Sequence, residues 1–161
     1  LRNFNGIDGV YNMEKSLVIT SANEMINLGK VIGKLLQEND ILALSGDLGA
    51  GKTTLAKGIA KGLEIKEIVN SPTFTIMKIY DGRLRLYHLD VYRIENPSED
   101  FELTEYFEDG GVCVIEWASN ISELLPEKLL LIEINDLGND ERQITFIDKT
   151  GYYQRILDGV K

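Results

Sequence analysis

The sequence predicts a three-layer α/β fold with a mixed, largely parallel central sheet. Along the 161 residues, segments typical of strands alternate with segments typical of helices. Such alternation favours a sheet that is covered by helices on both faces. In addition, residues 41–44 and 112–115 are apolar throughout, as expected for strands that are buried on both faces of a parallel sheet.

The first half of the chain is predicted to run strand, helix, strand, helix. Ser21 followed by Glu24 has the spacing of a capping box, which marks the start of the first helix. Apolar residues then recur at helical spacing. Gly58 lowers the helix propensity of the second helix, so we expect it to permit close packing on the sheet. The predicted segments are 16–20, 22–37, 41–45 and 52–62.

The second half is predicted to contain a hairpin, short helices and three further strands. Asp81-Gly82 between two extended segments is a strong hairpin signal. Asn96, Pro97 and Glu99 are typical of the first turn of a helix. The predicted segments are an extended run over 69–80, a strand over 83–89, a helix up to residue 107, a strand over 112–115, a short helix near 120–125, and strands over 129–134 and 143–147.

Composition limits the class of protein. Residues 13–161 are expected to form one domain, and residues 1–12, which lack periodicity, a disordered or extension tail. With a net charge of −9, the chain lacks the cationic surface that proteins use to bind nucleic acid.

No apolar stretch approaches the roughly 20 residues that span a bilayer, and no secretory signal is visible. One cysteine, Cys113, excludes an intrachain disulfide and a cysteine-based zinc site. We therefore expect a cytoplasmic protein.

Residues 46–53 match the phosphate-binding loop motif G-x-x-x-x-G-K-[ST], between a predicted strand and a predicted helix. Glycines let consecutive N–H groups turn inward toward an anion, and the helix N-terminus adds partial positive charge. We expect Lys52 to reach the β- and γ-phosphates and the Thr53 hydroxyl to bind Mg²⁺. The motif indicates a P-loop NTPase fold. The predicted nucleotide-binding residues are Asp47, Leu48, Gly49, Ala50, Gly51, Lys52, Thr53 and Thr54.

A phosphate loop needs a carboxylate for the metal at the end of a neighbouring strand. Asp90 follows the strand at 83–89 and Glu116 follows the strand at 112–115. The sequence alone does not rank these two acids. Both could converge on Mg²⁺, and either could instead form a salt bridge at a strand end. The predicted metal ligands are Thr53, Asp90 and Glu116.

Residues 71–75, Ser-Pro-Thr-Phe-Thr, lie between the phosphate-loop helix and Asp90, where switch segments often occur. The hydroxyl of Thr73 could sense a γ-phosphate or position water, although an ordinary loop entering a strand fits the spacing equally well. Lys52, Thr53, Thr73, Asp90 and Glu116 form the predicted catalytic set.

Three further residues lie near these motifs or could reach the site. Trp117 could shield Glu116 from water or dock a partner, although anchoring a core is the commoner role. His88, the only histidine, is expected to be a hydrogen-bonded structural residue rather than a general base. Arg142 follows a predicted turn and could approach the nucleotide.

Three classes of function remain open on this sequence. The first is a Mg²⁺-dependent ATPase whose turnover drives a protein complex. The second is a small-molecule or nucleoside kinase in which Asp90 is the base. The third is a nucleotide-gated binding module without significant catalysis. The chain has no Asn-Lys-x-Asp motif and no arginine-rich lid segment, which argues against a small GTPase and weakens a nucleotide kinase.

Taken together, these motifs resemble the bacterial TsaE family (formerly the YjeE family) of ATPases in tRNA threonylcarbamoyladenosine biosynthesis. The resemblance rests on residues 46–54, 71–75, 88–93 and 115–117, which occur in the family's order, and it covers about residues 15–148. One departure is Ala118-Ser119 after Trp117, where many members have proline and an acidic or amide residue.

The resemblance implies a P-loop α/β domain that binds ATP and ADP with Mg²⁺ and hydrolyses ATP weakly. It implies TsaD- and TsaB-type partners, which transfer a threonylcarbamoyl group onto the adenosine beside the anticodon. Hydrolysis by the TsaE-like protein would reset the complex and allow multiple turnovers, and tRNA would be met only through these partners. For the site, it gives Asp90 the role of the Walker B acid and Glu116 that of a second acid in Mg²⁺ binding.

Overall fold

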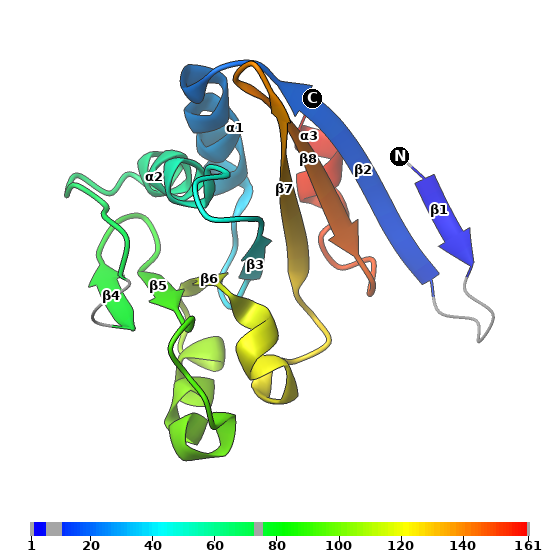
Figure 1. Ribbon diagram of the computed structural model, residues 1–161. Coiled ribbons are helices and arrows are strands. Elements are labelled where there is room, and N and C mark those ends of the chain that lie inside the picture. The colour runs from blue at the N-terminus through cyan, green and yellow to red at the C-terminus, as the bar shows by residue number, and fades with distance from the viewer. Residues whose placement is uncertain (1, 6–10, 73–75, 161) are drawn as a thin grey trace.

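The computed structural model describes residues 2–5, 11–72 and 76–160 (Figure 1). In chain order the elements are β1 (Arg2–Asn5), β2 (Tyr11–Ile19), α1 (Ala22–Leu35), β3 (Ile41–Ser45), α2 (Lys52–Gly62), β4 (Met77–Tyr80), β5 (Leu86–Asp90), η1 (Pro97–Glu108), β6 (Val112–Glu116), η2 (Ala118–Leu124), β7 (Leu130–Gly138), β8 (Glu141–Asp148) and α3 (Gln154–Gly159). The elements η1 and η2 are 3₁₀-helices.

The strands form one sheet in the order β1-β2-β8-β7-β3-β6-β5-β4. Its centre, β7-β3-β6-β5, is parallel, and the strands that flank this centre pair antiparallel. The predicted mixed sheet is therefore confirmed. Because β3 lies between β6 and β7, the loop that leaves its carboxyl end opens in the middle of the sheet edge, where α/β folds bind their ligands.

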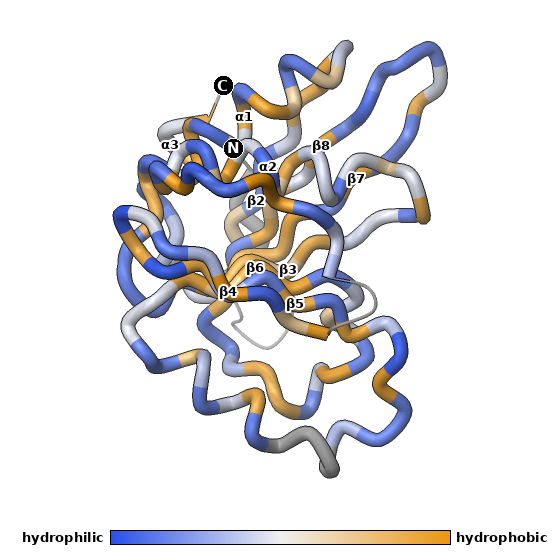
Figure 2. Tube along the Cα trace, turned by 90° about the vertical axis from the view of Figure 1, so that its left-hand side faces the viewer, coloured by the Kyte–Doolittle hydropathy of each residue, from blue (hydrophilic) through white to orange (hydrophobic). Residues whose placement is uncertain are grey.

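The sheet separates two hydrophobic clusters, which confirms the predicted three layers. Leu42 and Leu44 of β3 belong to the cluster shared with α1, α2 and α3. Ile41 and Ala43 belong to the cluster shared with η1 and η2. This alternation follows from the two-residue period of a strand. Figure 2 shows the hydrophobic residues concentrated along β3 and β6 in the middle of the fold.

Helices α1 and α2 meet through glycines. A Cβ atom built on Gly58 would lie 2.3 Å from the carbonyl oxygen of Ile26 and 2.9 Å from the Cα atom of Gly29. A Cβ atom on Gly62 would lie 2.8 Å from the Cα atom of Gly33. Gly58 therefore permits close packing as expected, but it packs on α1 and not on the sheet.

The secondary structure differs from expectation in three places. The segment before residue 107 is the 3₁₀-helix η1, and Asn96 makes no side-chain capping bond there. Helix α3 lies in the segment 149–161, where no element is predicted from the sequence. Residues 2–5 of the expected tail pair with β2 as strand β1. No helix in the described part of the chain is both long and apolar enough to cross a membrane.

Candidate nucleotide-binding site

The loop between β3 and α2 turns tightly around the N-terminus of α2. Gly49 and Gly51 have φ angles of 80° and 119°, in the left-handed region that glycine adopts at little cost. The N–H of Ala50 donates to the Asp47 carbonyl at 3.0 Å, and the N–H of Leu55 donates to the Gly51 carbonyl at 2.9 Å. Gly51 brings no side-chain cap. Because no side chain caps this helix, the N–H groups of the first turn of α2 can donate hydrogen bonds to an anion, which the partial positive charge of the helix N-terminus also attracts.

A cavity of about 400 Å³ opens beside this loop, a volume within the range of small-molecule sites. Residues from the loop, from the end of β5 and from the end of β6 line it together. They are Leu48, Gly49, Gly51, Lys52, Thr53, Thr54, Ser71, Asp90, Tyr92, Glu116 and Trp117. The structure therefore gathers the loop and both predicted acids around one space.

Most of the predicted site residues meet in this cavity, including Lys52, Thr53, Asp90 and Glu116. Two of the predicted loop residues do not line it. Asp47 lines a neighbouring cavity of about 900 Å³, and Ala50 is buried within the loop. Thr73 lies outside the described residues. That these residues bind a nucleotide stays a prediction.

Lys52 is the basic residue of the cavity and its side chain is folded onto the loop. Its Nζ donates to the Gly46 carbonyl and, at 3.3 Å, to the Asp47 carbonyl. The same Nζ lies 4.5 Å from the centroid of the Trp117 ring, within the range of a cation–π interaction. The ring of Tyr92 packs on the Trp117 ring, with the two ring centroids 4.9 Å apart. Phosphate oxygens would offer Lys52 stronger, charge-assisted hydrogen bonds than these neutral carbonyls.

The two acids are held side by side by the register of the sheet. Asp90 and Glu116 are the last residues of β5 and β6, and they are directly paired in the parallel ladder. Both are buried, with 5% and 3% of their surfaces exposed. Oδ1 of Asp90 accepts the N–H of Tyr92 at 3.0 Å, and Oε2 of Glu116 lies 2.8 Å from Nε2 of His88. Two carboxylates that are buried next to each other concentrate negative charge at this edge, which favours a cation in the cavity.

Asn120 ties the two strand ends together, although nothing in the sequence predicts this role. Its Nδ2 donates to the carbonyls of Val91 and Tyr92 at 3.0 and 3.1 Å. Trp117, which precedes η2, has a φ angle of 62°, an uncommon value for a bulky residue. An asparagine in a polar run gives no sequence signal for such a contact, since the contact depends on how β5 and β6 pair.

Arg142 of β8 contacts the phosphate loop itself. Its Nε donates to the Ala50 carbonyl at 2.9 Å, and its Nη1 lies 3.0 Å from Oδ1 of Asp136. The β7–β8 hairpin also approaches the loop closely, because a Cβ atom on Gly46 would lie 2.7 Å from the Ile134 carbonyl oxygen. The hairpin therefore supports the loop from the side away from β6.

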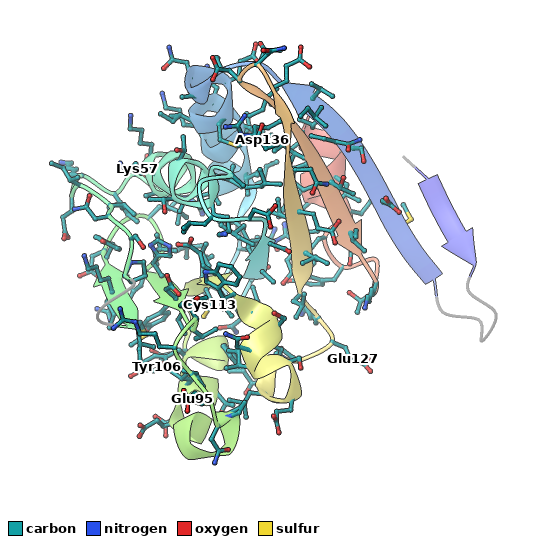
Figure 3. The ribbon with its side chains drawn as sticks, viewed as in Figure 1. Lys57, Glu95, Tyr106, Cys113, Glu127 and Asp136 are labelled. Carbon is teal, nitrogen blue, oxygen red and sulfur yellow. The ribbon has the colours of Figure 1, made fainter. Side chains whose placement is uncertain are left out.

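Cys113 takes no part in this site. Its side chain is buried, its Sγ lies 3.4 Å from the Tyr106 carbonyl, and the two residues lie near each other in the interior (Figure 3). Burial raises the pKa of the Cys113 thiol to about 12. The protonated thiol, and not the reactive thiolate, therefore prevails at neutral pH.

Comparison with known proteins gives one consistent family. The family model "Threonylcarbamoyl adenosine biosynthesis protein TsaE" matches residues 19–144. The tRNA threonylcarbamoyladenosine biosynthesis protein TsaE of Bacillus subtilis is 52% identical over 132 residues, which are 81% of this chain and 84% of that protein. The protein of the same name from Treponema pallidum is 43% identical over 130 residues, 80% of this chain and 96% of that protein.

A solved structure agrees with these sequence relatives. The crystal structure of YdiB from Bacillus subtilis superposes with a TM-score of 0.81 at 42% sequence identity. The superposition covers 91% of this chain and 93% of that one.

Proposed function

The chain belongs to the threonylcarbamoyl adenosine biosynthesis protein TsaE family, and on that premise we propose that it is a Mg²⁺-dependent, weak ATPase that supports threonylcarbamoyl modification of tRNA. The observation that carries the proposal is the single cavity where the phosphate loop faces two buried carboxylates. Such an arrangement serves phosphoryl chemistry, in which the protein mainly positions groups and compensates charge.

The N–H groups of the loop and the N-terminus of α2 would bind the phosphates, together with Lys52. Lys52 must leave the Gly46 and Asp47 carbonyls to do so, and it lines the cavity already. Burial of Lys52 to 7% exposure strengthens its interaction with an anion, because little water screens it.

Thr53, Asp90 and Glu116 fit a Mg²⁺ ion, since all three offer oxygen atoms to the same cavity. The described part of the chain holds no group of three or more His, Cys, Asp or Glu side chains arranged for a metal ion. Mg²⁺ commonly binds to one or two carboxylates and completes its shell with phosphates and water, which suits this donor set. When bound, Mg²⁺ would neutralise charge on the β- and γ-phosphates.

The lining of the cavity supports a slow rate of ATP hydrolysis. Lys52 is the one basic side chain among the described residues that line it. In P-loop NTPases an arginine supplied by the protein or by a partner stabilises charge in the transition state and raises the rate strongly. We therefore propose that the isolated chain turns over slowly and that a partner completes or orders the site.

TsaD- and TsaB-type proteins are the proposed partners, because the relatives are named for the same modification pathway. The net charge of −9 supports a role in which the partners hold the tRNA and this chain does not. A function in tRNA modification would be exercised in the cytoplasm.

Phosphate release from ATP tests the catalytic part of the proposal. We expect Lys52→Ala to lose turnover together with nucleotide binding, and Glu116→Ala to lose hydrolysis more than binding. Lys57→Ala, an exposed change in the same helix, should keep wild-type behaviour. Turnover by Lys52→Ala at the wild-type rate would refute the assignment of the site.

Reconstitution tests the pathway. TsaB- and TsaD-type proteins, tRNA and threonylcarbamoyl-adenylate would be combined with and without this chain, and modified tRNA counted per complex. Several products per complex only with the wild-type chain and ATP are expected. Equal product formation without the chain would contradict its role, and strict dependence of phosphate transfer on an added small acceptor would indicate a kinase instead.

A further inference from the structure

His88 makes a direct, buried contact with one of the two acids. Its Nε2 lies 2.8 Å from Oε2 of Glu116. His88 has no exposed surface and Glu116 is 3% exposed. A polar contact so well shielded from water is strong and directional, so it constrains the Glu116 carboxylate.

The strands explain why this contact reaches the acid from inside the protein. His88 precedes Asp90 by two residues on β5, so both side chains lie on the same face of the sheet. On β6 the register partner of His88 is Val114, two residues before Glu116. Glu116 lines the cavity and His88 does not. The imidazole therefore lies behind the carboxylate, away from any ligand in the cavity.

The surroundings of Nδ1, the other ring nitrogen of His88, indicate which atom donates the hydrogen bond between His88 and Glu116. Within the described residues, Nδ1 of His88 is buried without a hydrogen-bond partner. A buried donor without an acceptor pays its full desolvation cost. An unprotonated Nδ1 avoids placing such a donor there, so the proton lies on Nε2 and is donated to Oε2 of Glu116. His88 binds Oε2, and Glu116 lines the cavity, so Oε1 can serve a ligand there.

We propose that His88 is a positioning residue that holds Glu116 in the orientation that binds the divalent metal of the nucleotide complex. The inference rests on the proposed function, because it assumes that Glu116 is a metal ligand. Partners that hydrogen-bond to a metal ligand fix its orientation, and their loss typically weakens metal affinity by roughly 10- to 100-fold. His88 would touch neither the nucleotide nor the metal.

The test uses the full chain with saturating ADP and Mn²⁺ as the metal probe, and free Mn²⁺ is measured by electron paramagnetic resonance. His88→Leu removes the donor and is expected to weaken Mn²⁺ affinity by roughly 10- to 100-fold. ADP affinity measured in excess EDTA should be unchanged, since His88 lies behind the carboxylate and not against the phosphates. A purely structural role for His88 would alter both affinities alike.

Two substitutions of His88 by amide side chains form the matched control. His88→Gln carries an N–H donor that reaches nearly as far as Nε2, whereas His88→Asn carries the same group one carbon shorter. We expect His88→Gln to retain more Mn²⁺ affinity than His88→Asn. Equal loss in both variants would overturn the proposal even if His88→Leu does not fold.

Glu116→Gln separates failure of this inference from failure of the proposed function. If Glu116→Gln weakens Mn²⁺ binding and the His88 variants do not, the positioning role is wrong and the metal site stands. If Glu116→Gln leaves Mn²⁺ affinity unchanged, Glu116 is not a metal ligand, and both the metal assignment and the positioning role fail.

Discussion

At the residue scale, the phosphate loop depends on contacts from elements far away in the sequence. Arg142 is 92 residues from Ala50, yet its Nε donates to the Ala50 carbonyl. The side chain of Arg142 is 21% exposed and also pairs with Asp136. Because the loop itself is built from residues that favour turns, an external donor to its backbone restricts the conformations it can adopt.

Arg142→Ala is therefore expected to weaken nucleotide binding. A hydrogen bond from a charged donor contributes about 1.5–3 kcal/mol, so we expect a loss of roughly tenfold or more in ADP affinity. Titration of both proteins with ADP and Mg²⁺ measures the difference. Arg85→Ala is the control, since the Arg85–Asp81 ion pair is exposed at 52% and 75%. A loss of affinity for Arg85→Ala as large as that for Arg142→Ala would contradict the role given to Arg142.

At the element scale, strands β5 and β6 position Asp90 and Glu116, and helix α1 positions helix α2, which follows the phosphate loop. The pairing of Asp90 with Glu116 is a consequence of strand register, so a shift of one residue would separate the two carboxylates. The glycine contact between α1 and α2 brings the helix that begins at Lys52 close to its neighbour. The geometry of the site is thus set by the pairing of β5 with β6 and by the packing of α2 on α1, whose own residues do not line the cavity.

Gly58→Ala is expected to destabilise the protein. The new Cβ atom would lie 2.3 Å from the Ile26 carbonyl oxygen, so backbone must move, at a cost of about 1–3 kcal/mol in free energy of unfolding. Urea unfolding measures this cost. Lys57→Ala, exposed on the neighbouring position, should stay within about 0.5 kcal/mol of wild type. A Gly58→Ala protein as stable as wild type would show that α1 and α2 are less closely packed than described.

At the scale of the whole molecule, the C-terminal segment is tied to the start of β3. Asp40 precedes β3, is fully buried and pairs with Arg155 of α3. Tyr153 bridges the same region, since its hydroxyl accepts the N–H of Ile41 at 2.9 Å. Burial raises the pKa of Asp40, against the opposing effects of the Gln37 N–H and of Arg155. A buried carboxyl with a raised pKa links folding to pH.

The raised pKa of Asp40 determines in which direction the stability changes with pH. The folded protein binds the Asp40 proton at a higher pH than the unfolded chain does, so this contribution to stability is complete below the unfolded pKa of about 4. It is lost as pH rises through the folded pKa. We expect wild type to lose free energy of unfolding relative to Asp40→Asn as pH rises above about 4, measured by urea unfolding from acid to neutral pH. A difference between the two proteins that is independent of pH would contradict this role of Asp40.

Much of this fold was predictable, because it depends on local signals. The capping box at Ser21 was predicted, and its side chain accepts the Glu24 N–H. The phosphate loop and its flanking strand and helix were predicted with the bounds of α2 at 52–62. Buried strands such as Val112–Glu116 were predicted from apolar runs.

What remained unpredicted depends on contacts between distant segments. The glycine contact of Gly58 with α1, the support of the loop by Arg142 and the bond from His88 to Glu116 arise from sheet order and helix packing. Helix α3 was missed because its six residues are too few for a clear periodic pattern. The order of the eight strands likewise has no signature in the spacing of the residues.

Calorimetric titration with ADP and Mg²⁺ shows whether the phosphate loop binds a nucleotide. We expect one site per chain for the wild-type protein and no measurable heat of binding for Lys52→Ala, with matching far-UV circular dichroism to show that both are folded. Wild-type protein that binds neither ADP nor ATP in the presence of Mg²⁺, or Lys52→Ala that binds them as tightly as wild type, would rule out nucleotide binding at the phosphate loop.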